Sequence, residues 1–154
     1  MVIIPEMEQK KKNTKKVGDL GESIAVKYLK NKGFSIIERN YRKKYGEIDI
    51  VARGTFSSVK NPVSHETREV VHFVEVKSVS YETKEMLEIS VSHETYRPEE
   101  LVDGFKLNQI RKTAETWISE NQWNGEVQID VVAVHMVSRE KYARVKYIEN
   151  VIME

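Results

Sequence analysis

The chain of 154 residues contains no cysteine. Disulfides, thiol nucleophiles and thiolate metal sites are therefore excluded. Four histidines are present, but no two of them have a spacing that would place both on one helical turn or on alternate positions of a strand. This spacing argues against a zinc site built from sequence neighbours, although ligands could still meet across the fold.

The sequence also lacks an apolar run of the length that a membrane span requires. The short apolar opening, residues 1–5, is followed by lysines rather than preceded by them, which is the reverse of a secretory signal. We therefore expect a cytoplasmic protein. The length suits one domain, so we expect a flexible basic arm over residues 1–16 and a single folded domain over residues 17–154.

The formal net charge of only +1 conceals an uneven distribution of charge. Basic residues predominate in 1–16 and 39–53, and acidic residues predominate in 80–103. In the second basic segment, arginines and lysines alternate with two tyrosines, which suits a nucleic-acid backbone and equally a solvated hairpin turn. The candidate nucleic-acid-binding residues are Arg39, Arg42, Lys43 and Lys44 in this segment, and Lys106 and Arg111 further along the chain.

Hydrophobic periodicity predicts a mixed sheet flanked by helices. An apolar stripe that begins at Val17 predicts a first helix, with Gly33 at its C-terminal cap. A second helix is predicted with Asp103 as its N-cap. The predicted segments are a helix from 17, a strand over 34–38, a basic turn over 39–46, strands over 47–53 and 70–77, a weak strand over 86–91, a helix over 105–121, and strands over 127–136 and 144–151.

Two of the predicted strands carry charge where a core strand would carry apolar side chains. Glu47 and Asp49 share one face of the first, and Glu75 and Lys77 share one face of the second. Buried unpaired charge is costly, and it is usually retained only where a partner, often a metal, compensates it. Since consecutive strands usually pair, we predict that these two are antiparallel neighbours.

Carboxylates on adjacent strands, Asp49 and Glu75, would offer the hard oxygen ligands that Mg²⁺ or Mn²⁺ prefers. Lys77 beside them could position a nucleophile or neutralise charge in the transition state. Glu22 would reach the same site if the first helix packs across the sheet. The constellation predicts metal-dependent hydrolysis of a phosphodiester. The competing interpretation is a buried ion-pair cluster without catalytic function.

Four short motifs, in a fixed order along the chain, resemble those of a known family. They are Gly21-Glu22, Gly46-Glu47-Ile48-Asp49, Phe73-Val74-Glu75-Val76-Lys77 and Asp130-Val131-Val132-Ala133-Val134. The sequence resembles the YraN-type family of small bacterial proteins over residues 17–150. That family is similar to the Holliday-junction resolvases of the restriction-endonuclease-like, PD-(D/E)XK, superfamily. The fold implied is an α/β (α+β) one, with a mixed five-stranded sheet flanked by helices.

The resemblance also implies roles for residues. Asp49 and Glu75 would be ligands of Mg²⁺ or Mn²⁺, Lys77 the catalytic lysine and Glu22 the helix acid typical of the resolvases. Glu47 belongs to the motif, and it would either bind metal or pair with a basic residue. Asp130 lies in a segment that echoes the one around Asp49, and we interpret it as a structural acid or as one that supports the metal ligands.

Two features depart from the family pattern. Val79 and Gln128 stand where arginines are expected, which weakens phosphate contacts rather than metal binding. The connections over 54–69 and 80–100 are also long. The expected function is a divalent-metal-dependent nuclease for branched or single-stranded DNA, and a homodimer would be needed to cut two strands symmetrically. The alternative is a non-catalytic nucleic-acid-binding or accessory protein that retains the fold.

Overall fold

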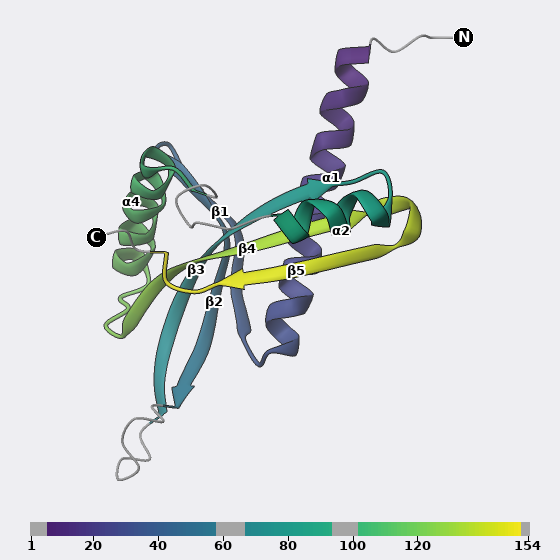
Figure 1. Ribbon diagram of the computed structural model, residues 1–154. Coiled ribbons are helices and arrows are strands. Elements are labelled where there is room, and N and C mark those ends of the chain that lie inside the picture. Colours follow the sequence, from purple (N-terminus) through teal and green to yellow (C-terminus); the bar gives the residue numbers. More distant parts are fainter. Residues whose placement is uncertain (1–5, 58–66, 94–101, 152–154) are drawn as a thin grey trace.

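The computed structural model describes residues 6–57, 67–93 and 102–151. They form one five-stranded sheet in the order β1-β2-β3-β4-β5, with three α-helices around it (Figure 1). All neighbouring strands are antiparallel except β3 and β4, which are parallel. The predicted mixed sheet is thus confirmed. The elements are α1 (Glu6–Asn31), β1 (Ser35–Lys43), β2 (Gly46–Ser57), β3 (Thr67–Ser80), α2 (Lys84–His93), α4 (Gly104–Glu120), β4 (Glu126–Val137), the 3₁₀ turn η1 (Ser138–Glu140) and β5 (Tyr142–Ile148).

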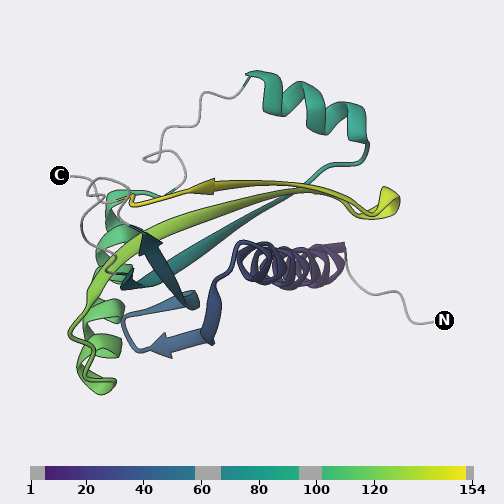
Figure 2. The ribbon, with the colours of Figure 1, turned by 90° about the horizontal axis from the view of Figure 1, so that it is seen from below.

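Helices α1 and α4 cover opposite faces of the sheet. Val74 of β3 belongs to the same apolar cluster as Leu29 of α1. Its neighbour Phe73 packs against Trp117 of α4, with the ring centroids 5.6 Å apart. Because successive side chains of a strand point to opposite faces, these two clusters are separated by the sheet. Figure 2 shows the sheet edge-on, with α1 and α2 on opposite sides of it.

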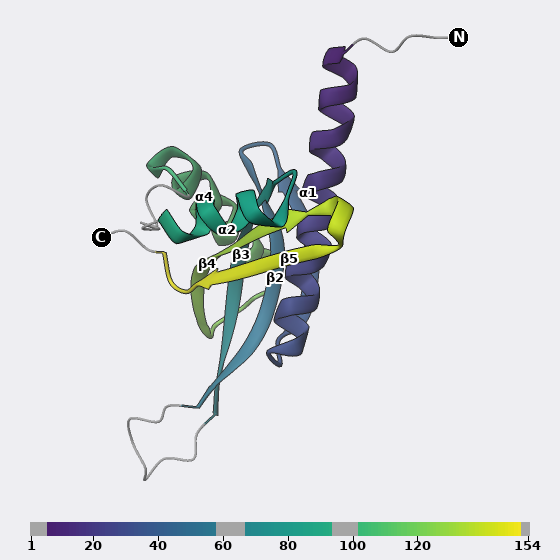
Figure 3. The same ribbon diagram turned by 45° about the vertical axis from the view of Figure 1, so that its right-hand side comes forward.

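The first helix begins earlier than its apolar stripe predicts. It starts at Glu6 and not near Val17, so the lysine-rich segment expected as an arm is helical from Glu6 onward. Lysine, glutamate and glutamine propagate a helix well once a packed segment has nucleated it. The early turns of α1 extend past the sheet (Figure 3). None of the described helices is long and apolar enough to cross a membrane.

The end of α1 is fixed by a glycine, as predicted. Gly33 has a φ of +95°, the left-handed conformation that glycine adopts without strain. The Gly33 N–H donates to Lys30 O at 3.0 Å, and the Phe34 N–H donates to Leu29 O at 3.0 Å. These two bonds form a Schellman motif, which satisfies carbonyls at the end of the helix and turns the chain into β1.

Three predicted segments differ in the structure. The basic turn predicted over 39–46 is mostly strand, because β1 continues to Lys43 and pairs there with Gly46 across a two-residue turn. The connection over 54–69 includes extensions of β2 and β3, while residues 58–66 lie outside the described part. The weak strand predicted over 86–91 is wrong: these residues lie in α2, whose first turn is capped by Thr83 Oγ1 accepting from the Met86 N–H at 3.1 Å.

Gly21 allows α1 to approach β3. A Cβ added at Gly21 would lie 1.8 Å from Ser78 Oγ and 2.8 Å from Ser78 Cβ, whereas one added at Gly18 would meet nothing within 4 Å. We therefore expect Gly21→Ala to lower the free energy of unfolding by about 2 kcal/mol through overpacking. Gly18→Ala is the matched control, and it should raise stability by about 0.5–1 kcal/mol through helix propensity. Urea unfolding measures both changes, and equal effects of the two substitutions would contradict the close approach.

Candidate active site

Strands β2 and β3 stop pairing at Asp49, the aspartate of the Gly46-Glu47-Ile48-Asp49 motif. Their regular register ends at Ile50 and Val74. Beyond that point the Val76 N–H donates to the carboxylate of Asp49, Oδ2, at 2.8 Å. The Asp49 side chain thus takes the place of a backbone carbonyl of β2 as the acceptor for the Val76 N–H. The two strands separate at this point, where Asp49 and Glu75 lie next to each other.

The separation also breaks the alternation of β2. Ile48 belongs to the apolar cluster on the α4 side, and Ile50 belongs to the cluster on the α1 side. In a regular strand, residues two apart share a face. The backbone therefore changes its facing direction at Asp49, so that this carboxylate can contact groups on both sides of the sheet. The simple alternation predicted for the strand that carries Glu47 and Asp49 therefore does not hold.

The carboxyl groups of Asp49 and Glu75 interact directly. Burial, followed by the negative charge of Asp49, raises the pKa of Glu75 to about 7. Burial also raises the pKa of Asp49, although the Val76 N–H opposes this rise. When Glu75 is protonated it donates a hydrogen bond to Asp49. When it is ionised, its buried Oε2 has no hydrogen-bond donor among the described residues.

Two lysines approach the other oxygen of Glu75. Lys77 Nζ lies 3.9 Å from Glu75 Oε1, and Lys106 Nζ lies 3.8 Å from the same atom. Lys77 comes from β3, as the motif predicts, but Lys106 comes from the first turn of α4. Sequence reasoning assigned Lys106 only to nucleic-acid binding. The available signal was the Asp103 N-cap, which accepts from the Lys106 N–H at 2.8 Å and fixes the turn that carries this lysine.

Glu22 lies on the opposite, α1 side of the separation. Its Oε1 accepts from Arg39 Nε at 3.2 Å and from Asn40 Nδ2 at 2.9 Å. Together with Glu47 and Asp49 it lines a cavity of about 370 Å³. Glu75 and Lys77 are not part of that lining. Asp49 therefore belongs to two groups: it lines the cavity together with Glu22 and Glu47, and it interacts with Glu75.

The donor set fits a divalent cation held by two protein carboxylates. Among the described residues no group of three or more His, Cys, Asp and Glu side chains is arranged to hold a metal ion. Asp49 and Glu75 nevertheless provide adjacent hard oxygens, one of them an unpartnered buried atom. A cation between them would replace the shared proton and relieve their repulsion. Mg²⁺ is commonly held by one or two carboxylates while it retains water ligands.

Comparison with known proteins places these residues in a family. A family model described as uncharacterised protein family UPF0102 matches residues 21–134. The chain belongs to UPF0102. This is the YraN family that the motifs predict, and the match spans every candidate from Glu22 to Asp130.

Individual UPF0102 relatives cover most of the chain. A UPF0102 protein of Campylobacter lari is 37% identical over 118 residues, which is 77% of this chain and 82% of the relative. One from Thermotoga petrophila is 39% identical over 113 residues, 73% of this chain and 81% of the relative. One from Dictyoglomus turgidum is 30% identical over 139 residues, 90% of this chain and 98% of the relative.

In this UPF0102 chain Asp130 lies in a separate buried network. Its Oδ1 accepts from Gln128 Nε2 and from the Asn150 N–H, both at 2.8 Å. Its Oδ2 lies 2.6 Å from His72 Nδ1 and accepts from the Tyr147 hydroxyl at 2.5 Å. The two oxygens thus have four protein partners. Gln128, which replaces an expected arginine, is directed to Asp130 itself.

Most basic candidates of the UPF0102 chain contact acids. Arg39 pairs with Glu22, and Arg42 pairs with Glu47 at 3.2 Å. Lys106 contacts Glu75, as described above. Lys44 lies exposed in the two-residue turn of the hairpin, and Arg111 is half-buried on α4. The structure therefore brings Arg39, Arg42 and Lys106 to the acids of the site.

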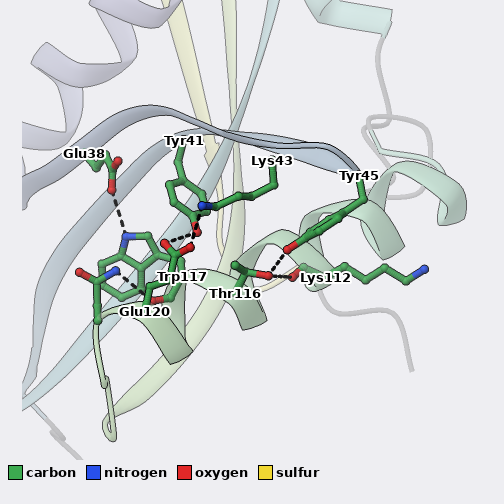
Figure 4. A network of polar contacts seen from close by, with 9 residues as sticks. Glu38, Tyr41, Lys43, Tyr45, Lys112, Thr116, Trp117 and Glu120 are labelled. Carbon is green, nitrogen blue, oxygen red and sulfur yellow. Dashed lines mark hydrogen bonds and ion pairs between the residues drawn. The ribbon is translucent and has the colours of Figure 1, made fainter.

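The rest of the basic hairpin is attached to α4 (Figure 4). Lys43 Nζ lies 2.6 Å from Glu120 Oε1, and the Tyr41 hydroxyl donates to Glu120 Oε2 at 2.9 Å. Tyr41 is buried, and its burial, together with the hydrogen bond to Glu120, raises its pKa to about 12. The Tyr45 hydroxyl contacts Thr116 Oγ1. Both tyrosines and Lys43 thus join β1 and its turn to the helix that carries Lys106.

Proposed function

We propose that this protein is a divalent-metal-dependent nuclease that hydrolyses phosphodiester bonds in nucleic acid, with DNA as the expected substrate. The observation that carries the proposal is the Asp49–Glu75 pair. Two interacting carboxylates with an unpartnered buried oxygen lie where β2 and β3 separate, and two lysines approach them. The resemblance to the PD-(D/E)XK superfamily supports the same residues.

The residues of the site have separate tasks. Asp49 and Glu75 would hold Mg²⁺ or Mn²⁺. When bound, such an ion supplies Lewis-acid catalysis and lowers the pKa of a coordinated water. The ammonium of Lys77, 3.9 Å from Glu75 Oε1, would stabilise negative charge on a phosphoryl oxygen. Glu22, oriented by Arg39 and Asn40, faces the cavity beside Asp49, where it can orient a water molecule or contribute to cation binding.

The test is a cleavage assay of the purified protein on four-way, flapped, single-stranded and duplex DNA and on RNA. We expect cleavage of at least one DNA substrate with Mg²⁺ or Mn²⁺, and none with EDTA. Glu115→Gln, at an exposed position of α4, is the matched control and should cleave normally. Binding without cleavage under every metal condition would contradict the proposal and favour a non-catalytic nucleic-acid-binding protein. Paired incisions in the four-way substrate would indicate a two-fold dimer.

A further inference from the structure

Helix α4 presents an exposed aromatic side chain in the turn that carries Lys106. Phe105 is 76% exposed, more than any other large apolar residue in the described part of the chain. A single exposed apolar residue is ordinary and needs no explanation by itself. Phe105, however, directly precedes Lys106, whose ammonium contacts Glu75. Its position, rather than its exposure alone, suggests a role.

The turn that carries Phe105 is well fixed. Asp103 Oδ1 accepts from the Lys106 N–H at 2.8 Å, and the Leu107 N–H donates to Asp103 O at 2.9 Å. Leu107 is buried in the core on the α4 side of the sheet. At 100° per residue, Phe105 projects about 200° away from Leu107 and so away from the sheet. Lys106 lies between these two directions, at the boundary of the buried and exposed faces of the helix. Phe105 is therefore directed outward from a turn whose backbone is fixed.

The surroundings of the ring suit a nucleobase better than a protein surface. Asp103, Gly104 and Asn108 are exposed, and a Cβ added at Gly104 would meet nothing within 4 Å. Among the described residues, one ring with small and polar neighbours does not provide the apolar area of a stable protein interface. An aromatic side chain and a cation carried by one helical turn can together bind an unpaired base and its phosphate.

We infer that the first turn of α4 binds an unpaired nucleotide of the substrate, with Phe105 stacked on its base and Lys106 in contact with its phosphate. The placement of this nucleotide at the reacting bond rests on the proposed nuclease function. The inference narrows the expected substrate to nucleic acid with unpaired bases at the cut and names the residues that would recognise them. A duplex hides the faces of its bases within the stack, so Phe105 discriminates against it.

The test measures binding of labelled single-stranded and duplex DNA by fluorescence anisotropy in EDTA, where no metal-dependent cleavage interferes. Phe105→Ala should weaken binding of the single strand about tenfold and leave the duplex within about twofold, whereas Phe105→Trp should bind the single strand as the wild type does. Ile89→Ala, which removes an exposed apolar side chain from α2, is the matched control and should change neither affinity.

Lys106 is tested by the salt dependence of the same binding. Lys106→Gln should reduce the slope of log Kd against log salt by about 0.7 for the single strand, because one phosphate contact is lost. Lys112→Gln, at an exposed position of the same helix, should leave the slope unchanged. Thermal unfolding of each variant shows whether it is folded.

The binding results separate this inference from the proposed function. Equal loss of single-strand and duplex binding in Phe105→Ala, or no loss of either, would overturn the inference even if the protein cleaves DNA. Selective loss of single-strand binding, restored by Phe105→Trp, would support it even if no cleavage is found.

Discussion

Glu75→Gln is expected to abolish metal-dependent cleavage and, at the same time, to make the metal-free protein more stable at pH 8. The loss of cleavage should be at least about a hundredfold, because a proposed metal ligand is replaced by a neutral amide. The gain in stability has a different cause. At pH 8 Glu75 is above its pKa of about 7, so its buried negative charge lies beside the charge of Asp49, whereas the amide of glutamine is neutral and can donate to Asp49.

The direction of the pH dependence follows from the raised pKa. Glu75 has a pKa of about 7 in the folded protein, against an ordinary value of 4.5. The folded state therefore binds this proton more tightly than the unfolded state does. The stabilisation is fully present below pH 4.5 and is lost as the pH rises through 7. At 1.36 kcal/mol per pKa unit, the loss is on the order of 3 kcal/mol.

The measurement is chemical denaturation of wild type and Glu75→Gln at pH 5 and at pH 8 without divalent metal. The difference in unfolding free energy between the two proteins should shift in favour of Glu75→Gln as the pH rises. Glu115→Gln should show no such shift. If Glu75→Gln is instead less stable than wild type at pH 8, then Glu75 stabilises the fold through Lys77 and Lys106. The cluster would then be a structural ion pair rather than a strained site.

Asp130→Ala is expected to destabilise the protein by about 3–5 kcal/mol, because it removes the common acceptor of a network whose centre, Asp130 and His72, is buried. His72, the Tyr147 hydroxyl, Gln128 and the Asn150 N–H would each lose a partner. Buried donors without an acceptor are costly, and a cavity adds to that cost. Urea unfolding measures the change.

Two further variants show whether Asp130 acts only in the fold. Glu140→Ala, at an exposed position of η1, should change stability by less than about 0.5 kcal/mol. Asp130→Asn keeps one acceptor oxygen, so it should be destabilised less than Asp130→Ala and should retain cleavage under conditions where it is folded. A folded Asp130→Asn protein without cleavage would show that Asp130 serves the site and would contradict a purely structural role.

The sequence predicts those features that arise from local pattern. The stripe from Val17 and the cap at Gly33 follow from helix geometry, and the antiparallel pairing of the strands that carry Asp49 and Glu75 follows from their adjacency in sequence. By contrast, the change of facing direction between Ile48 and Ile50 depends on the separation of β2 from β3. Local alternation contains no information about that separation.

Two other features depend on contacts between distant segments. Lys106 meets Glu75 only because α4 packs on the sheet. The Asp103 N-cap predicts that Lys106 lies in the first turn of a helix, but not that this turn contacts Glu75. The segment over 86–91 alternates as a strand would, but a short apolar run is ambiguous between strand and helix. Its helical form is selected by burial of Leu87 and by the contact of Glu88 with Arg144.

The sheet contains a single parallel pairing, between β3 and β4. This pairing determines where residues can be inserted without moving the acids of the site. Parallel neighbours need a long crossover, and here the crossover includes α2 and α4. The two strands that carry the acids are joined directly to each other and precede it. Because the entropic cost of closing a loop grows only slowly with its length, residues can be added between α2 and α4 without displacing Asp49 or Glu75. The crossover can thus exchange the groups that we propose meet the substrate, such as Phe105, while the acids keep their positions.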